Sequence, residues 1–156
     1  MELEGLQAPT PRSRLDVERL DVYDRRGDGH TLARHCGVPP EELAERLREH
    51  PALPATGSFP DAAIAQRCVE ACVGAHRHLV ALWESGQRPR LALEHDMGET
   101  VGDVLTQRAL RSAHPQPRPA TAVRVVLRRN PAYPSGFAVL TAYPVVAPTT
   151  TYPDAP

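Results

Sequence analysis

The 156-residue chain contains no lysine, so all 18 of its basic side chains are arginines. Any phosphate contact from a basic side chain must therefore come from a guanidinium or an imidazole, never from an ammonium group. Aromatic residues make up only 4% of the chain, although apolar residues together make up 41%. A folded core must therefore consist largely of leucine, valine and alanine side chains.

Cysteine is also scarce, and the three cysteines do not suggest a disulfide framework. An odd number without regular spacing argues against a small secreted domain held together by disulfides. Cys68 and Cys72 are four residues apart and His76 follows after another four, so all three would share one face of a helix. Three ligands from one straight helix give poor tetrahedral geometry. We therefore interpret the cysteines as small buried residues and expect neither a metal nor another cofactor.

Long apolar runs are absent as well. No run approaches the roughly 20 residues that span a bilayer, and the acidic N-terminus lacks the apolar segment of a signal peptide. We therefore expect a soluble chain without membrane contact. Its length fits one domain with one core. We divide it into a partly flexible lead-in arm (1–28), a folded domain (29–145) and a Pro/Thr-rich tail (146–156).

Charge is divided unevenly along the chain, although the net charge is only −1. Residues 1–103 carry 18 acidic side chains and 12 arginines, a net of −6. Residues 104–156 carry six arginines and one acidic side chain, a net of +5. A chain with this division can present a basic face to a polyanion. The alternative is that these arginines are ordinary solvated surface residues.

Two short helices are expected in the first part of the folded domain. The run 30–36 predicts one, with Gly37 at its C-terminal end. The next begins at the two prolines before Glu41, since proline suits a first helical turn, and Leu43 and Leu47 form its apolar stripe.

A long helix is expected over 60–84. Its apolar residues recur at helical spacing, and Gly86 follows as a stop signal. Ser58 and Asp61 are three residues apart at its start. This spacing predicts a capping box with Ser58 as the N-cap.

Strands are expected after the helices. Residues 91–94, 100–105, 122–128 and 136–143 predict four strands, and the proline-containing run 130–135 predicts a hairpin loop. Helices first and an antiparallel sheet afterwards indicate an α+β fold, with the N-terminal helices packed on a curved sheet.

Four features occur in a particular order along the chain. They are the pair His30 and His35 with Gly37, then Arg46, then the run Ser58-Phe59-Pro60-Asp61, and finally the strand Leu140-Thr141-Ala142-Tyr143-Pro144. This ordered set resembles the bacterial RNase A-like toxin domain, which is found at the C-termini of contact-dependent growth inhibition (CdiA-type) proteins and related polymorphic toxins. The resemblance covers residues 30–144. It implies a kidney-shaped RNase A-like fold without the disulfides of RNase A.

The resemblance also implies an active site, formed by His35, Arg46, Thr141 and Tyr143. Their chemistry suits metal-independent RNA cleavage, in which the 2′-OH attacks the adjacent phosphorus and leaves a 2′,3′-cyclic phosphate. Histidine titrates near neutral pH and suits proton transfer, and the arginine fork suits a charged phosphate. Thr141 and Tyr143 are two apart on a strand and so share a face. His30 is a candidate second acid–base group, although five residues along a helix from His35 it would point about 140° away.

Each of these residues also has a structural interpretation. His35 alone would be an ordinary buried or surface histidine, and Arg46 could form an i, i+4 ion pair with Glu42. Threonine and tyrosine are common strand residues. Their joint occurrence in the family's order favours the functional interpretation.

The partners expected by resemblance are an RNA substrate, with transfer RNA as one candidate, and a cognate immunity protein. The chain would then be a delivered toxin that acts in the cytoplasm of a target bacterium. Arg124, Arg128 and Arg129 are candidates for RNA contacts. Two alternatives stay open. One is an inactive member that binds RNA or protein, and the other is an ADP-ribosylating toxin that would use Glu94 or Glu99 as its catalytic glutamate.

Overall fold

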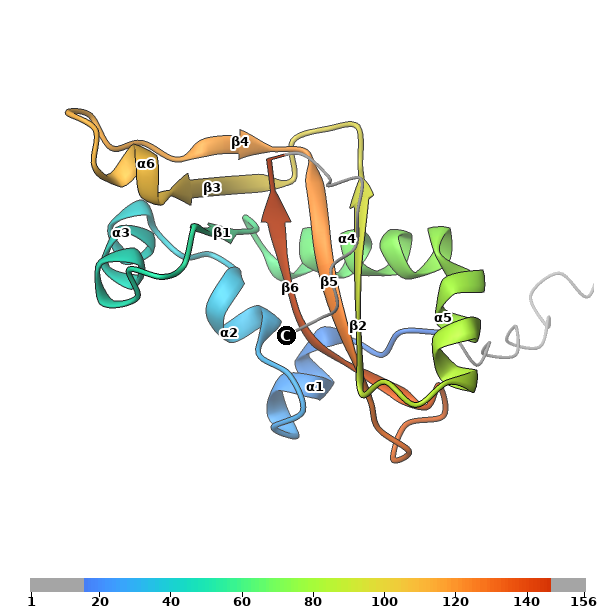
Figure 1. The fold of residues 1–156 in the computed structure, drawn as a ribbon. Helices are drawn as coiled ribbons and strands as arrows, with labels where there is room; N and C mark the ends of the chain where they lie inside the picture. Colours follow the sequence, from blue (N-terminus) through green and yellow to red (C-terminus); the bar gives the residue numbers. More distant parts are fainter. Residues whose placement is uncertain (1–15, 147–156) are drawn as a thin grey trace, which may run out of the picture.

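The computed structural model describes residues 16–146 and shows two three-stranded antiparallel sheets flanked by helices (Figure 1). In chain order the elements are α1 (Leu20–Arg25), α2 (Thr31–His35), α3 (Pro40–Glu49), β1 (Ala55–Ser58), α4 (Ala62–Ala75), α5 (Arg77–Ser85), β2 (Arg90–Asp96), β3 (Gly102–Thr106), α6 (Gln107–Leu110), β4 (Arg118–Ala120), β5 (Ala122–Arg129) and β6 (Phe137–Val145). The predicted α+β class is confirmed, with the strands divided between two sheets. Within residues 16–146 no helix has the length and apolar character needed to cross a membrane.

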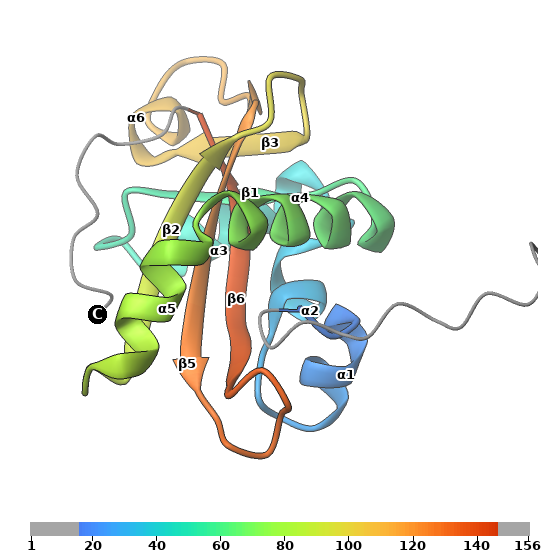
Figure 2. The ribbon, with the colours of Figure 1, turned by 90° about the vertical axis from the view of Figure 1, so that its right-hand side faces the viewer.

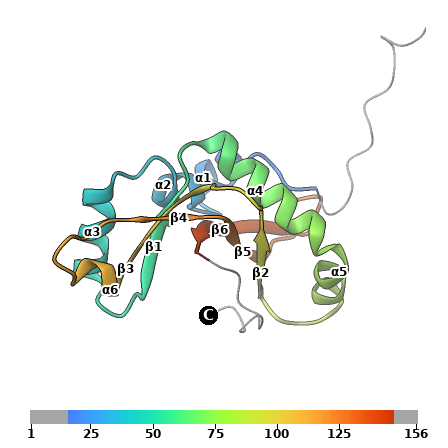
Figure 3. The same cartoon turned by 90° about the horizontal axis from the view of Figure 1, so that it is seen from above.

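The sheet β2-β5-β6 separates the main core from the opposite side of the molecule. Helix α4 lies across one face of this sheet (Figures 2 and 3). The fully buried residues of this face include Val123, Val125 and Leu127 of β5. Cys68 and Cys72 of α4 pack in the same cluster at 0% exposure, which confirms them as small core residues. Period-two alternation leaves the other face of the sheet free to line a site.

A β-bulge in β6 shapes that other face. Thr141 pairs with Val126, but Val139 pairs with Leu127, so Leu140 is an extra residue in β6. An inserted residue interrupts the alternation of side chains, and Leu140 and Thr141 both line the same cavity.

The bulge also holds the start of α2. The backbone N–H of His30 donates to the Leu140 carbonyl at 3.0 Å. The neighbouring residue must be glycine, because a Cβ at Gly29 would lie 2.3 Å from the carbonyl oxygen of Val139. The chain therefore passes directly against β6 as it enters α2.

The second sheet, β1-β3-β4, packs against the end of β6. A Cβ at Gly102 would lie 2.4 Å from the Ser58 carbonyl oxygen and 2.7 Å from Pro144 Cγ, so this close approach also requires glycine. Helix α3 covers the sheet with Leu43 and Leu47, which form a small core with Leu105. The stripe predicted for this helix is thus confirmed, and it fixes α3 beside β1.

The predicted helix 60–84 is two helices, α4 and α5, with a break at His76. The His76 ring donates from Nδ1 to the Cys72 carbonyl at 2.9 Å. The backbone N–H of His76 bonds instead to Val73 O at 3.2 Å. In a continuing α-helix the backbone N–H of His76 would bond to the Cys72 carbonyl. The His76 ring occupies this carbonyl instead, and α4 ends there. The predicted stop at Gly86 is confirmed, since Gly86 is the C-cap of α5.

The predicted capping role of Ser58 is wrong. Ser58 ends β1, where its hydroxyl accepts a hydrogen bond from the Val38 N–H at 2.9 Å. Asp61 is the N-cap of α4 and accepts from the Ile64 N–H at 2.9 Å. The sequence pattern marked the right helix start but assigned it to the wrong residue, because β1 was not predicted.

Part of the predicted lead-in arm belongs to the fold. Leu20 and Tyr23 of α1 are 2% and 1% exposed and pack in the main core. Besides β1, the elements α1, α6 and β4 were not predicted from the sequence. Residues 1–15 and 147–156, which include nearly all of the predicted tail, lie outside the described residues.

Candidate active site

His35, the last residue of α2, is buried at 5% exposure. Its Nδ1 lies 3.0 Å from the carbonyl oxygen of Gly57 in β1. A carbonyl oxygen only accepts hydrogen bonds, so Nδ1 must carry the proton. In the neutral ring the lone pair is therefore on Nε2, which is the atom available to act as a base.

The environment of His35 favours the neutral ring. Burial, helped by the nearby charges of Arg46, His30 and Arg34, lowers its pKa to about 4, although the hydrogen bond to Gly57 opposes this shift. At neutral pH the free protein therefore holds His35 as an unprotonated imidazole.

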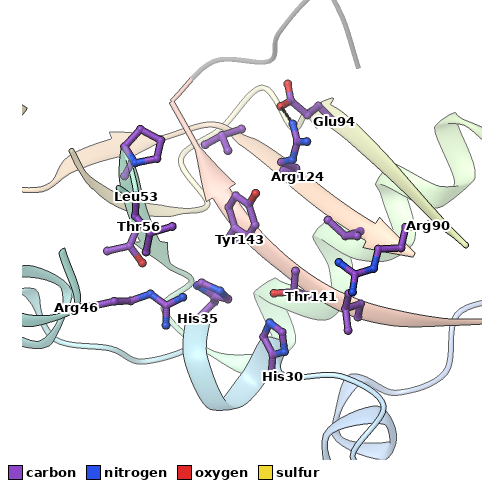
Figure 4. A pocket seen from close by; sticks show the side chains of 15 residues that line it. His30, His35, Arg46, Leu53, Thr56, Arg90, Glu94, Arg124, Thr141 and Tyr143 are labelled. Carbon is purple, nitrogen blue, oxygen red and sulfur yellow. Dashed lines mark hydrogen bonds and ion pairs between the residues drawn. The ribbon is translucent and has the colours of Figure 1, made fainter. Parts of the chain in front are cut away.

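A cavity of about 530 Å³ opens between this histidine and the free face of the sheet (Figure 4). It is lined by His30, His35, Arg46, Leu53, Pro54, Ala55, Thr56, Arg90, Glu94, Arg124, Val126, Leu140, Thr141, Tyr143 and Val145. The four residues expected to form the active site, and the candidate His30, all line this one cavity. They come from α2, α3 and β6 and from the residue before α2.

Arg46 reaches the cavity from α3. Its Nε is buried and has no hydrogen-bond partner in the protein. Among the described residues it forms no ion pair with Glu42, so the structural interpretation offered for Arg46 is wrong. A buried guanidinium donor without a partner is costly, and here it is close enough to His30 and His35 to lower the pKa of both rings.

Thr141 and Tyr143 face the cavity together, as their spacing predicted, and Ala142 between them is 0% exposed in the core. The Thr141 hydroxyl oxygen is buried without a hydrogen-bond partner in the protein. The Tyr143 ring centroid lies 5.3 Å from that of His35. Burial raises the pKa of Tyr143, and the Arg124 charge opposes this, so the phenol stays protonated at neutral pH.

His30 joins the same cavity, with its ring centroid 6.4 Å from that of His35. The angular separation expected along a helix does not apply, because His30 is the N-cap of α2 with φ −146° and ψ 23°. Burial, followed by the charge of Arg34, lowers the pKa of His30, and Asp24 opposes this.

Sequence reasoning missed the role of Glu94 and Arg124 as a buried ion pair in the cavity wall. Their side chains are 3% and 13% exposed, and Arg124 Nη1 lies 2.9 Å from Glu94 Oε1. In the strand register Glu94 pairs with Arg124, and Arg124 pairs with Tyr143, so all three share one row across the sheet. A glutamate inside a predicted strand was the available signal. Sequence reasoning also missed two other residues of the cavity wall, Arg90 and Thr56. The Thr56 hydroxyl is buried and has no hydrogen-bond partner in the protein.

The other arginines proposed for RNA contact lie elsewhere. Arg128 is exposed and lines a neighbouring cavity. Arg129 points to the opposite side of the sheet, where it donates to the carbonyls of Trp83 and Glu84 and its guanidinium lies 4.8 Å from the Trp83 ring centroid. Arg129 thus holds the end of α5 in place.

Neither Glu99 nor the cysteine beside His35, Cys36, lines this cavity. Glu99 is exposed and pairs with Arg67 at 2.7 Å. The thiol of Cys36 has its pKa raised to about 12 by burial, so it is not a thiolate at neutral pH. Within residues 16–146, no three His, Cys, Asp or Glu side chains are grouped in a way that could hold a metal ion.

Fold and site together define a small α+β protein with a histidine, an arginine and two hydroxyl groups around one cavity. Residues 29–144 match the family described as the bacterial CdiA-CT RNAse A domain. The chain belongs to this family.

A solved structure has the same fold. In the crystal structure of a CdiA-CT/CdiI complex from Y. kristensenii 33638, one chain is 22% identical to this one with a TM-score of 0.65. The match covers 75% of this chain and 99% of that chain. No curated protein matches the sequence.

Proposed function

We propose that this domain cleaves RNA by metal-independent transphosphorylation in the cavity around His35. The 2′-oxygen forms a bond to phosphorus, the bond from phosphorus to the 5′-oxygen breaks, and the product ends in a 2′,3′-cyclic phosphate. The observation that carries this proposal is the hydrogen bond from His35 Nδ1 to Gly57 O, which makes Nε2 the basic atom.

His35 is the general base. Its Nε2 takes the proton of the attacking 2′-OH. A pKa of about 4 in the free protein makes it a weak base, but a bound phosphate brings negative charge that favours the imidazolium and so raises the pKa. The base therefore strengthens when substrate binds.

Arg46 and Thr141 bind the reacting phosphate. Each has a buried polar atom without a partner in the protein, and a phosphate supplies acceptor oxygens for a guanidinium and a hydroxyl. In the pentacoordinate transition state the phosphoryl oxygens gain negative charge, which the Arg46 guanidinium stabilises.

Tyr143 is the favoured general acid for the leaving 5′-oxygen. Its phenol is protonated at neutral pH, because burial raises its pKa, and it lies beside His35 on the cavity wall. His30 is the competing acid, and its lowered pKa leaves it mostly unprotonated at pH 7. If Tyr143 is the acid, kcat/KM stays level from neutral pH to beyond pH 9. If His30 is the acid, kcat/KM decreases as the pH rises, and this decrease already begins below pH 7.

An immunity protein is the proposed protein partner. The chain from Y. kristensenii was crystallised as a CdiA-CT/CdiI complex. We extend this to a cognate protein that covers the cavity of the present chain in the producing cell. Delivery into the cytoplasm of a target bacterium, with transfer RNA as one candidate substrate, is part of the same proposal.

The test is incubation of the purified protein with total bacterial RNA in EDTA, beside His35→Asn. The asparagine amide nitrogen takes the position of Nδ1 and keeps the hydrogen bond to Gly57, but no atom replaces Nε2. We expect cleavage with cyclic-phosphate ends and a loss of about 10²–10⁴-fold in His35→Asn. The exposed His78→Asn is the matched control and should cleave normally. Cleavage that needs a metal, or that survives in His35→Asn, would contradict the mechanism.

A further inference from the structure

Helix α2 has only five residues, yet both histidines of the cavity lie at its ends. His30 is its N-cap and His35 is its last residue. A helix this short is not stable by itself in water, so its position depends on contacts with the rest of the protein. At the C-terminal end, the Phe59 N–H donates to the His35 carbonyl at 2.7 Å and the Gly37 N–H donates to the Phe59 carbonyl at 2.8 Å. The segment after β1 thus holds the end that carries His35.

The N-terminal end of α2 lacks the usual cap. An N-cap residue commonly has an extended backbone, and its side chain accepts a hydrogen bond from the N–H of the second or third helical residue. His30 has φ −146° and ψ 23°, and its side chain forms no such bond. Its ring lines the cavity instead (Figure 4). The turn that brings His30 to the cavity therefore leaves the first N–H groups of α2 for another residue to satisfy.

Asp24 of α1 satisfies one of them. Its Oδ2 accepts a hydrogen bond at 2.9 Å from the N–H of Ala33, the third residue of α2. Helix α1 lies beside α2 (Figures 1 and 2), and Leu20 and Tyr23 hold α1 in the main core. A carboxylate also suits the positive end of the helix dipole. The cap of α2 thus comes from outside the helix, from an element that the core fixes in place.

The second carboxylate oxygen of Asp24 shows that the residue does more than cap. Its Oδ1 is buried without a hydrogen-bond partner in the described part of the chain. A neutral serine or asparagine caps a helix about as well as an aspartate, and a buried carboxylate oxygen without a partner is unfavourable. Burial, Arg34 and Arg46 lower the pKa of His30, and the Asp24 carboxylate opposes them. Its charge therefore favours the protonated His30 ring.

We propose that Asp24 is a positioning residue for His30. By capping α2 from α1, it holds the helix in place while the His30 ring stays free to face the cavity. The effect on rate rests on the proposed ribonuclease function, whereas the effects on the helix and on the ring do not. The proposal adds a residue from outside the cavity to those that determine its activity.

An activity measurement compares Asp24 with a matched cap elsewhere. Asp61 accepts from the N–H of Ile64, the third residue of α4, also at 2.9 Å. Asp24→Ala and Asp61→Ala should each lower the melting temperature by about 3–5 °C. Only Asp24→Ala should lower kcat/KM, by about 10-fold and mainly through kcat, because misplaced groups react slowly. Asp24→Asn keeps an acceptor oxygen for Ala33, so it should recover the melting temperature and most of kcat/KM.

A measurement by NMR tests the role without relying on cleavage. The other titratable and charged side chains that line the cavity are His35, Arg46, Arg90, Glu94, Arg124 and Tyr143. These are the same in every variant, so a change in the His30 titration reports the loss of Asp24. The pKa of His30 should fall in Asp24→Asn and stay unchanged in Asp61→Asn. Hydrogen exchange of the Ala33 amide should be about 5-fold faster in Asp24→Ala and unchanged in Asp24→Asn.

The outcomes separate the two proposals. A wild-type protein that cleaves no RNA, together with the expected changes at His30 and Ala33, supports the positioning role and contradicts the ribonuclease. Equal rate losses in folded Asp24→Ala and Asp61→Ala overturn the positioning role and leave the ribonuclease standing. The positioning role is also overturned if Asp24→Asn is as slow as Asp24→Ala, or if the His30 titration is the same in the wild type and in both Asp24 variants.

Discussion

The two faces of the sheet β2-β5-β6 carry side chains of different kinds. The face under α4 carries side chains such as Val125 and Leu127, which are fully buried against apolar neighbours. The opposite face carries a buried ion pair and the hydroxyl of Thr141, which is buried without a partner in the protein. Apolar burial stabilises a fold, whereas buried polar groups without partners oppose it. The comparison shows that one face provides stability, whereas the other carries buried polar groups that do not.

Side chains along a strand point alternately to the two faces of the sheet, so adjacent residues can belong to the core and to the cavity wall. Leu127 and Val125 point into the core, while Arg124 between the core residues Val123 and Val125 points into the cavity. A substitution on β5 or β6 should therefore affect either stability or activity according to which face it is on. Four substitutions or conditions test this division, beginning with the largest expected effect.

Arg46→Ala should lower kcat/KM by about 10²–10³-fold, because it removes the cation that faces the phosphate. The free energy of unfolding should change by less than about 1 kcal/mol. The acid limb of the pH profile should move to higher pH, since Arg46 lowers the pKa of His35. Arg48→Ala is the control on the same helix, where Arg48 is exposed and pairs with Glu45 at 3.4 Å. Equal losses in both variants would contradict the assignment.

Leu127→Ala should show the opposite pattern. Leu127 is 0% exposed on the core face, and truncating a buried leucine costs about 2–5 kcal/mol. Urea unfolding should report this loss, while kcat/KM below the unfolding transition should stay near that of the wild type. A loss of activity in fully folded Leu127→Ala would show that the two faces are coupled.

Acid should destabilise the wild type more than His35→Asn. The folded-state pKa of His35 is about 4, below its ordinary value of 6.5, so the unfolded chain binds more protons between these values. This contribution is complete above pH 6.5 and is lost as the pH falls through 4, and it amounts to about 3 kcal/mol. Urea unfolding at pH 7 and at pH 4 measures it. An equal loss of stability in both proteins would show that His35 titrates normally.

Thr141→Val should have the smallest main effect of the four, and it should stabilise the protein rather than destabilise it. Valine has the same shape but lacks the buried hydroxyl, so the free energy of unfolding should rise by about 1 kcal/mol. Activity should fall, because the phosphate loses a hydrogen-bond donor. Thr106→Val is a control for a hydroxyl with a structural role, since Thr106 caps α6 through the Ala109 N–H at 3.0 Å, and it should destabilise. A destabilised Thr141→Val would mean that the hydroxyl has a structural partner.

Much of the fold followed from local patterns in the sequence. The strands near 91–94, 122–128 and 136–143 and the hairpin between the last two are all present, because apolar alternation and turn residues act over a few residues. Short or irregular elements were missed. Strand β1 spans Ala55–Ser58 and includes a glycine, and it is held by pairing with β3 rather than by its own residue preferences.

The sequence by itself determined which groups are available and which near neighbours share a face. It supplied arginine as its only basic residue besides histidine, and it placed Thr141 and Tyr143 two apart on one strand, where the period of two makes them neighbours. Only the tertiary structure decided how distant groups act together. Gly57, 22 residues from His35, sets the protonated nitrogen of that ring, and the backbone turn at His30 brings a second ring beside it. Local geometry follows from spacing, whereas contacts across the fold depend on how whole elements pack.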